Sequence, residues 1–142
     1  MQIKEINSGE AYEFLKEEDV ALIDVRTDAE YAFVGQVDLT EISGKSFLVP
    51  WKVFPAMSIN PRFQITLEKN LRNEFPEKDP QDLKLIFMCR SGARSLEAAM
   101  YCTQLGFKDC YNLSSGFEGN PDDKGHRSNI DGWRAENLPW RQ

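Results

Sequence analysis

Apolar side chains along the chain fall into two patterns, which predict alternating strands and helices. Continuous apolar runs at residues 20–25 and 83–88 are typical of strands that are buried on both faces. Between Phe63 and Phe75 an apolar residue recurs every four positions, which predicts an amphipathic helix packed on a core rather than a binding groove. Because strands and helices alternate, the pattern favours an α/β fold with a mainly parallel sheet.

Weaker patterns predict the remaining elements. Shorter strands are expected at residues 2–6, 47–50 and 109–113. Helices are expected at 9–16 after a Ser8 cap, from Thr27 or Asp28 to Phe33, from Asn60-Pro61 to Phe75, from near Ser95 to Gly106, and near 131–136. The apolar face of the helix near Ser95 is assigned to Leu96, Ala99, Met100 and Thr103, widened by Cys102 and Leu105. Loops are expected at residues 38–45, 52–59, 76–82 and 114–130.

Composition narrows the class of protein. The chain has 142 residues, of which 41% are hydrophobic and 28% charged, as expected for one soluble globular domain over residues 1–142. A net charge of −6 argues against nucleic acid or an anionic membrane as the main partner. There is no apolar stretch of membrane-spanning length and no signal-peptide core, so the expected location is cytoplasmic.

Of the three cysteines, Cys89 alone has the sequence surroundings expected of a reactive cysteine. An odd count without C-x-x-C disfavours a disulfide framework or a zinc site. Cys102 lies on a predicted helix and Cys110 in a predicted strand, where both are expected to be buried small hydrophobes. Cys89 instead ends the 83–88 strand, immediately before a five-residue loop and a helix start.

That placement suits an activated nucleophile. Backbone amides of a loop that enters a helix can converge on one point and form an anion site with the helix dipole. A cysteine that faces such a site is favoured as its thiolate. Arg90 and Arg94 add positive charge, and Gly92 permits a turn with positive φ. A lone cysteine at a strand end is most often inert, and this combination of neighbours is what favours a nucleophile at Cys89.

The stretch C-R-S-G-A-R-S at residues 89–95 resembles the active-site loop of rhodanese-like sulfurtransferases. Residues 22–26, L-I-D-V-R, with Glu30 resemble a second family element, and G-W-R-A at 132–135 with Leu138-Pro139 a third. The three occur in the family's order and span most of the chain. One departure follows Gly35, where the family usually has histidine and this chain has Gln36-Val37 and then the polar residues 38–45.

The resemblance implies a five-stranded parallel sheet between helices and a two-step transfer of sulfur. Cys89 would attack thiosulfate or a similar small anionic donor, and the resulting persulfide would pass its outer sulfur to a thiol or cyanide. No metal or organic cofactor is implied. The implied supporting residues are Asp24, Arg26 and Glu30, and the implied substrate-binding residues are Arg90, Ser91, Gly92, Ala93, Arg94 and Ser95.

The two arginines are expected to act differently. Arg90 should project toward the pocket mouth, while Arg94 should brace the loop against a carboxylate, with Asp24 and Glu30 as the candidates. The forked guanidinium suits a bracing role better than a lysine would. His126, in the 114–130 loop, is expected to be solvated, with a role toward substrate as the alternative.

Two other functions remain as alternatives. Cysteine phosphatases and arsenate reductases also use a cysteine in an anion-binding loop, but the phosphatase pattern is C-x₅-R. Here Arg94 follows Cys89 after four residues, Ser95 takes the position of the phosphatase arginine, and Met88 stands where histidine often precedes. The remaining alternative is a binding module or sulfur carrier that serves a protein acceptor.

Overall fold

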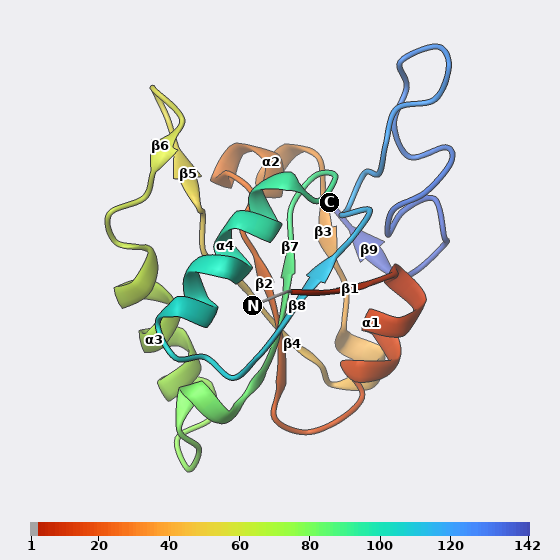
Figure 1. Ribbon diagram of the computed structural model, residues 1–142. Coiled ribbons are helices and arrows are strands. Elements are labelled where there is room, and N and C mark those ends of the chain that lie inside the picture. The colour runs from red at the N-terminus through yellow and green to blue at the C-terminus, as the bar shows by residue number, and fades with distance from the viewer. Residues whose placement is uncertain (1–2) are drawn as a thin grey trace.

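The computed structural model describes residues 3–142 as a central parallel sheet with helices on both faces (Figure 1). Five strands lie in the order β1-β8-β7-β2-β4, and every neighbouring pair is parallel. This confirms the predicted α/β class and the five-stranded sheet. The strands are β1 Lys4–Ile6, β2 Val20–Asp24, β4 Lys45–Leu48, β7 Lys84–Met88 and β8 Asp109–Leu113. Of the predicted strand at 2–6, residue 2 lies outside the described residues.

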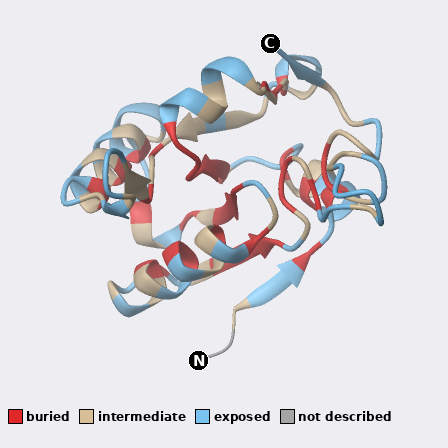
Figure 2. Ribbon diagram, turned by 90° about the horizontal axis from the view of Figure 1, so that it is seen from above, coloured by how far each residue is buried: buried red, intermediate tan, exposed pale blue. Residues whose placement is uncertain are grey.

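Within residues 3–142, four α-helices surround the sheet and two short 3-10 helices lie in the connections. The α-helices are α1 Ser8–Phe14, α2 Asp28–Phe33, α3 Phe63–Glu74 and α4 Ala93–Gln104, and the 3-10 helices are η1 Thr40–Ile42 and η2 Pro80–Asp82. Over residues 3–142 none of these helices is long and apolar enough to cross a bilayer. Viewed from above, buried residues follow the strands, while the outward sides of the helices are exposed (Figure 2).

The core is divided into two clusters by the sheet. Alternate side chains of a strand point to opposite faces, so Leu85 and Phe87 pack with α3 and α4 while Ile86 and Met88 pack on the α1 side. This is why the apolar runs of the central strands are continuous. Cys89 continues the parity of Leu85 and Phe87 and therefore belongs to the cluster under α3 and α4.

The described part of the chain also contains two small antiparallel sheets. β3 Gln36–Val37 pairs with β9 Trp140–Arg141 near the C-terminus, and β5 Lys52–Val53 pairs with β6 Ser58–Ile59. The prediction that 52–59 would be irregular is therefore wrong in part, because its ends form a hairpin. The strand predicted at 47–50 begins earlier, at Lys45, because its polar first residues pair with β2 at the edge of the sheet.

Several predicted helix boundaries are wrong. The side chain of Asn7, not Ser8, caps α1, and it forms a capping box with Glu10. α3 begins at Phe63, because the Asn60 side chain accepts from the Arg62 amide in a turn that precedes the helix. α4 begins at Ala93, two residues before the predicted start.

Two further helix predictions need correction. The buried face of α4 consists of Ser95, Ala98, Ala99 and Cys102, while Met100 is 46% exposed. Residues 131–136 form bends and turns rather than a helix, and Gly132 within this segment has a positive φ of +96°. Trp133 in this segment is fully buried in the α1-side cluster.

Candidate active site

Cys89 lies at the carboxyl end of β7, between neighbouring strands β2 and β8. Its side chain is 1% exposed, and the backbone N–H of Gly92 donates to its Sγ at 3.1 Å. Ala93, Arg94 and Ser95 form the first turn of α4, where backbone N–H groups have no acceptor within the helix. The sulfur therefore faces the positive end of a twelve-residue helix.

Gly92 is required by the shape of the loop. Its φ is +112°, and a Cβ at this position would lie 2.5 Å from the carbonyl oxygen of Ser114. Both facts exclude any other residue without a shift of the backbone. As the N-cap of α4, Gly92 turns the chain so that its own amide points back to Cys89.

The segment after β8 holds the cysteine loop through backbone hydrogen bonds. The amide of Phe117 donates to the Cys89 carbonyl at 2.9 Å, and those of Glu118 and Gly119 donate to the Arg90 carbonyl at 3.0 and 3.1 Å. A Cβ on Gly116 would lie 2.5 Å from both carbonyl oxygens. The start of the predicted 114–130 loop is thus a backbone support for the site, which composition alone did not indicate.

Arg94 points to α2, where it meets Glu30. Two hydrogen bonds, 2.7 and 2.9 Å long, join its guanidinium to the two carboxylate oxygens. Burial alone would raise the pKa of Glu30, but the hydrogen bonds and charge of Arg94, together with Thr27, lower it from 4.5 to about 2. Of the two carboxylates expected as partners for Arg94, the structure selects Glu30.

Asp24 instead pairs with Arg26. Both residues are buried, and the Arg26 Nε and Nη2 donate to the two Asp24 oxygens at 2.9 and 2.7 Å. Nη2 also donates to the Gly35 carbonyl at 2.7 Å, and the guanidinium lies 4.4 Å from the ring centre of Phe117. This pair therefore ties the end of β2 to the turn after α2 and to the segment that supports the cysteine loop.

The other loop residues differ in exposure. Arg90 is exposed, Ser91 is half-buried and Ser95 is buried. The Ser95 hydroxyl lies 3.3 Å from Cys89 Sγ and 2.5 Å from Asn112 Oδ1, and the Asn112 amide in turn contacts Glu5. Asn112 and Glu5 were missed from the sequence, although a polar residue within the otherwise buried strand D-C-Y-N-L was an available signal.

His126 lies exposed in a turn of the 114–130 loop. Asp122 closes this turn by accepting from the Lys124 amide at 2.9 Å, the His126 amide at 2.8 Å and the Asn129 side chain at 2.8 Å. The end of the loop is thus organised by Asp122, while its beginning supports Cys89.

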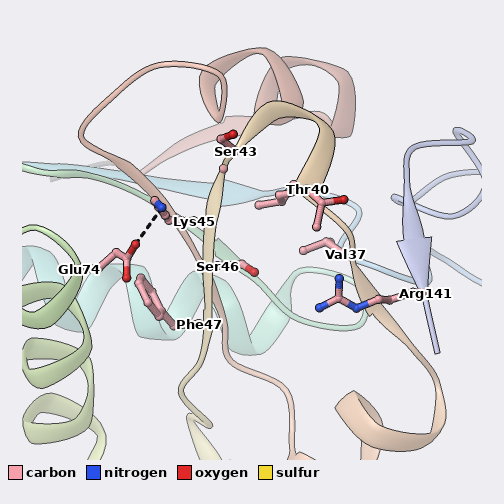
Figure 3. A pocket seen from close by; sticks show the side chains of 10 residues that line it. Val37, Thr40, Ser43, Lys45, Ser46, Phe47, Glu74 and Arg141 are labelled. Atoms are coloured by element: carbon pink, nitrogen blue, oxygen red, sulfur yellow. Dashed lines mark ion pairs between the residues drawn. The ribbon is translucent and has the colours of Figure 1, made fainter.

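Size does not identify the site among the cavities of the surface. A cavity of about 470 Å³ opens between β3, β4 and the end of α3, where Lys45 and Glu74 form an ion pair of 2.9 Å (Figure 3). None of its lining residues belongs to the cysteine loop. The surroundings of Cys89 are distinguished instead by the Gly92 amide and the N-terminus of α4.

The two other cysteines lie in apolar surroundings that oppose ionisation. Burial raises the pKa of the Cys110 thiol to about 11, and it raises that of Cys102 further. Both side chains belong to the cluster between the sheet and α3 and α4. They are therefore poor nucleophiles at neutral pH.

Comparison with known proteins finds related chains. An uncharacterized protein of Rickettsia rickettsii is 36% identical over 144 residues, covering 99% of each chain. A putative sulfurtransferase of Bacillus subtilis is 31% identical over 109 residues, covering 76% of this chain and 82% of its own.

Solved structures show the same architecture. The crystal structure of Rv0390 from M. tuberculosis has a TM-score of 0.81 and 36% identity, and the match covers 100% of this chain and 99% of that one. The polysulfide-sulfur transferase homodimer of Wolinella succinogenes shares the fold at a TM-score of 0.65 and 22% identity, over 97% of this chain and 77% of its own. Residues 7–120 match the rhodanese-like domain. The chain therefore belongs to the rhodanese-like domain family.

Proposed function

We propose that the protein is a sulfurtransferase that carries sulfur on Cys89. The Cys89 thiolate attacks the outer sulfur of thiosulfate or a similar donor, a Cys–S bond forms, and the bond to the sulfite sulfur breaks. The sulfite leaves with that electron pair. Cyanide or a thiol then takes the outer sulfur of the persulfide, and the thiolate is restored.

The observation that carries this proposal is the Gly92 amide that donates to Sγ at the N-terminus of α4. A persulfide is anionic, so it gains from the same amides and helix dipole as the thiolate. Ala93, Arg94 and Ser95 offer the other free amides of the first turn. Arg90 is exposed, and in this proposal its positive charge meets the anionic end of a donor as it arrives.

The geometry weighs against a phosphatase. A phosphatase loop needs its arginine to face the phosphoryl group, whereas Arg94 is committed to Glu30 through two hydrogen bonds. Ser95, at the phosphatase arginine position, is buried against Asn112. The shorter loop, with one amide 3.1 Å from the sulfur, suits a single extra sulfur atom better than a tetrahedral phosphate.

An assay of sulfur transfer tests the proposal. Purified protein is given thiosulfate and cyanide, and thiocyanate is measured, with Cys89→Ser as the inactive control and Cys110→Ser as the matched cysteine control. We expect the wild type and Cys110→Ser to form thiocyanate and Cys89→Ser to form none. Equal turnover by Cys89→Ser would refute the mechanism. Replacing cyanide by small thiols and by protein thiols then shows which class of acceptor is preferred, including the carrier role toward a protein.

A further inference from the structure

A line of polar contacts runs from the surface of β1 to the sulfur of Cys89. Glu5 accepts from Asn112 Nδ2 through both carboxylate oxygens, at 2.9 and 3.2 Å. At the other end of that amide, Asn112 Oδ1 lies 2.5 Å from Ser95 Oγ, which lies 3.3 Å from Cys89 Sγ. Asn112 and Ser95 are buried, whereas Glu5 is exposed.

The partners of Asn112 fix the orientation of its side-chain amide. The Glu5 carboxylate and the carbonyl oxygen of Gly92, 3.1 Å away, both face the same end. Both groups are acceptors, so only the NH₂ end of Asn112 can satisfy them. The reverse orientation would place an oxygen against two oxygens. Oδ1 must therefore face Ser95 and accept its proton.

The hydroxyl of Ser95 has only one proton to donate. Its shortest contact is the 2.5 Å to Asn112 Oδ1, against 3.2 Å to the Gly92 carbonyl and 3.3 Å to Cys89 Sγ. Toward the sulfur the hydroxyl therefore presents a lone pair. It can accept from the Cys89 thiol, but it can donate to the thiolate only by leaving a buried carbonyl oxygen unpaired.

We propose that Asn112, anchored by Glu5, is a positioning residue that holds the Ser95 proton away from Cys89. The inference rests on the proposed function only in that it concerns the same nucleophile. The thiolate is then stabilised by the Gly92 amide and the first turn of α4, without help from the nearby hydroxyl. Since intrinsic nucleophilicity falls as a thiolate becomes more stable, this arrangement keeps the sulfur reactive.

The rate of Cys89 alkylation by iodoacetamide, followed by mass spectrometry across a pH range, tests the inference. Asn112→Leu removes the Oδ1 acceptor at similar side-chain volume, which leaves the Gly92 carbonyl at 3.2 Å and the sulfur at 3.3 Å as acceptors for the Ser95 hydroxyl. The charged sulfur is the stronger acceptor of the two, so the hydroxyl should donate to the thiolate. A hydrogen bond to the charged sulfur favours the thiolate, so the pH midpoint of alkylation should fall by about one to two units. Alkylation reads the thiol directly, so the result stands whether or not the protein transfers sulfur.

Ser95→Ala provides the matched control in a double-mutant cycle. If the hydroxyl carries the effect, Asn112→Leu should shift the midpoint in the presence of Ser95 and leave it in place in the Ser95→Ala background. The other charged residues around the loop are the same in the wild type, the two single variants and the double variant, so their effect on the midpoint cancels in the cycle. These residues are Glu5, Asp24, Glu30, Arg90, Arg94 and Glu118.

Two outcomes would overturn the inference. One is a midpoint in Asn112→Leu that stays the same or rises, and the other is an equal shift with and without Ser95. Cooperative thermal melting of each variant shows that it is folded. Should Asn112→Leu fail to melt cooperatively, Asn112→Val is measured in its place, because a smaller β-branched residue suits the strand and cannot overpack it.

Discussion

Arg94 and Glu30, 64 positions apart in sequence, are joined by two hydrogen bonds of 2.7 and 2.9 Å. The pair connects the first turn of α4 to α2. Glu30 is also the N3 residue of the capping box of α2, in which it accepts from the amide and hydroxyl of Thr27. The Glu30 carboxylate therefore takes part in two structures: it belongs to the cap of α2, and it pairs with Arg94 of the cysteine loop.

Arg94→Ala should lower both kcat for sulfur transfer and thermal stability, because the loop loses its contact with Glu30 and the Gly92 amide is no longer held against the sulfur. An unpaired, half-buried Glu30 should reduce the free energy of unfolding by about 1–3 kcal/mol. Arg94→Lys should recover only part of both, since an ammonium cannot make the two-pronged contact. Steady-state kinetics and thermal melting of each variant measure these effects.

Arg90→Ala is the matched control for the loss of one positive charge. Arg90 is exposed, so its loss should mainly raise KM for thiosulfate and leave the melting temperature near that of the wild type. An Arg94→Ala variant that melts like Arg90→Ala, with only KM changed, would contradict the bracing role. Both arginines would then be better explained as ligands of the donor.

Glu30 should make stability depend on pH in the acid range. Its pKa is lowered in the folded protein from 4.5 to about 2, so the pair stabilises the folded state fully above pH 4.5. That contribution is lost as pH falls from 4.5 toward 2, because over this range the unfolded chain binds a proton at Glu30 that the folded state does not. Urea unfolding over this range should give a wild-type advantage over Glu30→Gln that shrinks as pH falls. An advantage that does not change between these limits would show that the ion pair is not its source.

Gly92→Ala should destroy the site while Gly125→Ala should not. Both glycines have positive φ, +112° and +80°, but a Cβ on Gly92 would lie 2.5 Å from the Ser114 carbonyl, whereas nothing lies within 4 Å of one on Gly125. Backbone strain is thus common to both variants and the collision is specific to Gly92. Sulfur transfer should fall at least tenfold in Gly92→Ala alone. Comparable activity in the two variants would mean that the loop tolerates a displaced Gly92 amide.

The sequence was sufficient for the parts of the structure that depend on local pattern. Continuous apolar runs located β2 and β7, four-residue spacing located α3, and the end of an apolar run placed Cys89 at the carboxyl edge of the sheet. The resemblance of the 89–95 loop to a known family predicted the fold in which Cys89 lies. These features can be predicted from sequence because strand burial and helix periodicity depend on residues close together in the chain.

Features that depend on contacts between residues far apart in the chain could not be predicted from the sequence pattern. Trp133 was placed on a short helix, but the segment is held by burial of its ring and by a 2.7 Å hydrogen bond from Nε1 to the Pro139 carbonyl. Asn112 and Glu5 meet only because β1 and β8 are neighbours in the sheet. Met100 was assigned to the core because helical periodicity predicts an apolar stripe but not which residues lie at the centre of the buried face. Packing against the sheet centres that face on Ala98 and Cys102.

The mass of the intact protein before and after exposure to thiosulfate shows whether Cys89 carries sulfur. We expect a gain of one sulfur atom, reversed by cyanide, in the wild type and in Cys102→Ser and Cys110→Ser. Cys89→Ser should gain nothing. A sulfur that still adds to Cys89→Ser, or a wild type that gains none although Cys89 is reduced and reacts with iodoacetamide, would contradict a persulfide on Cys89.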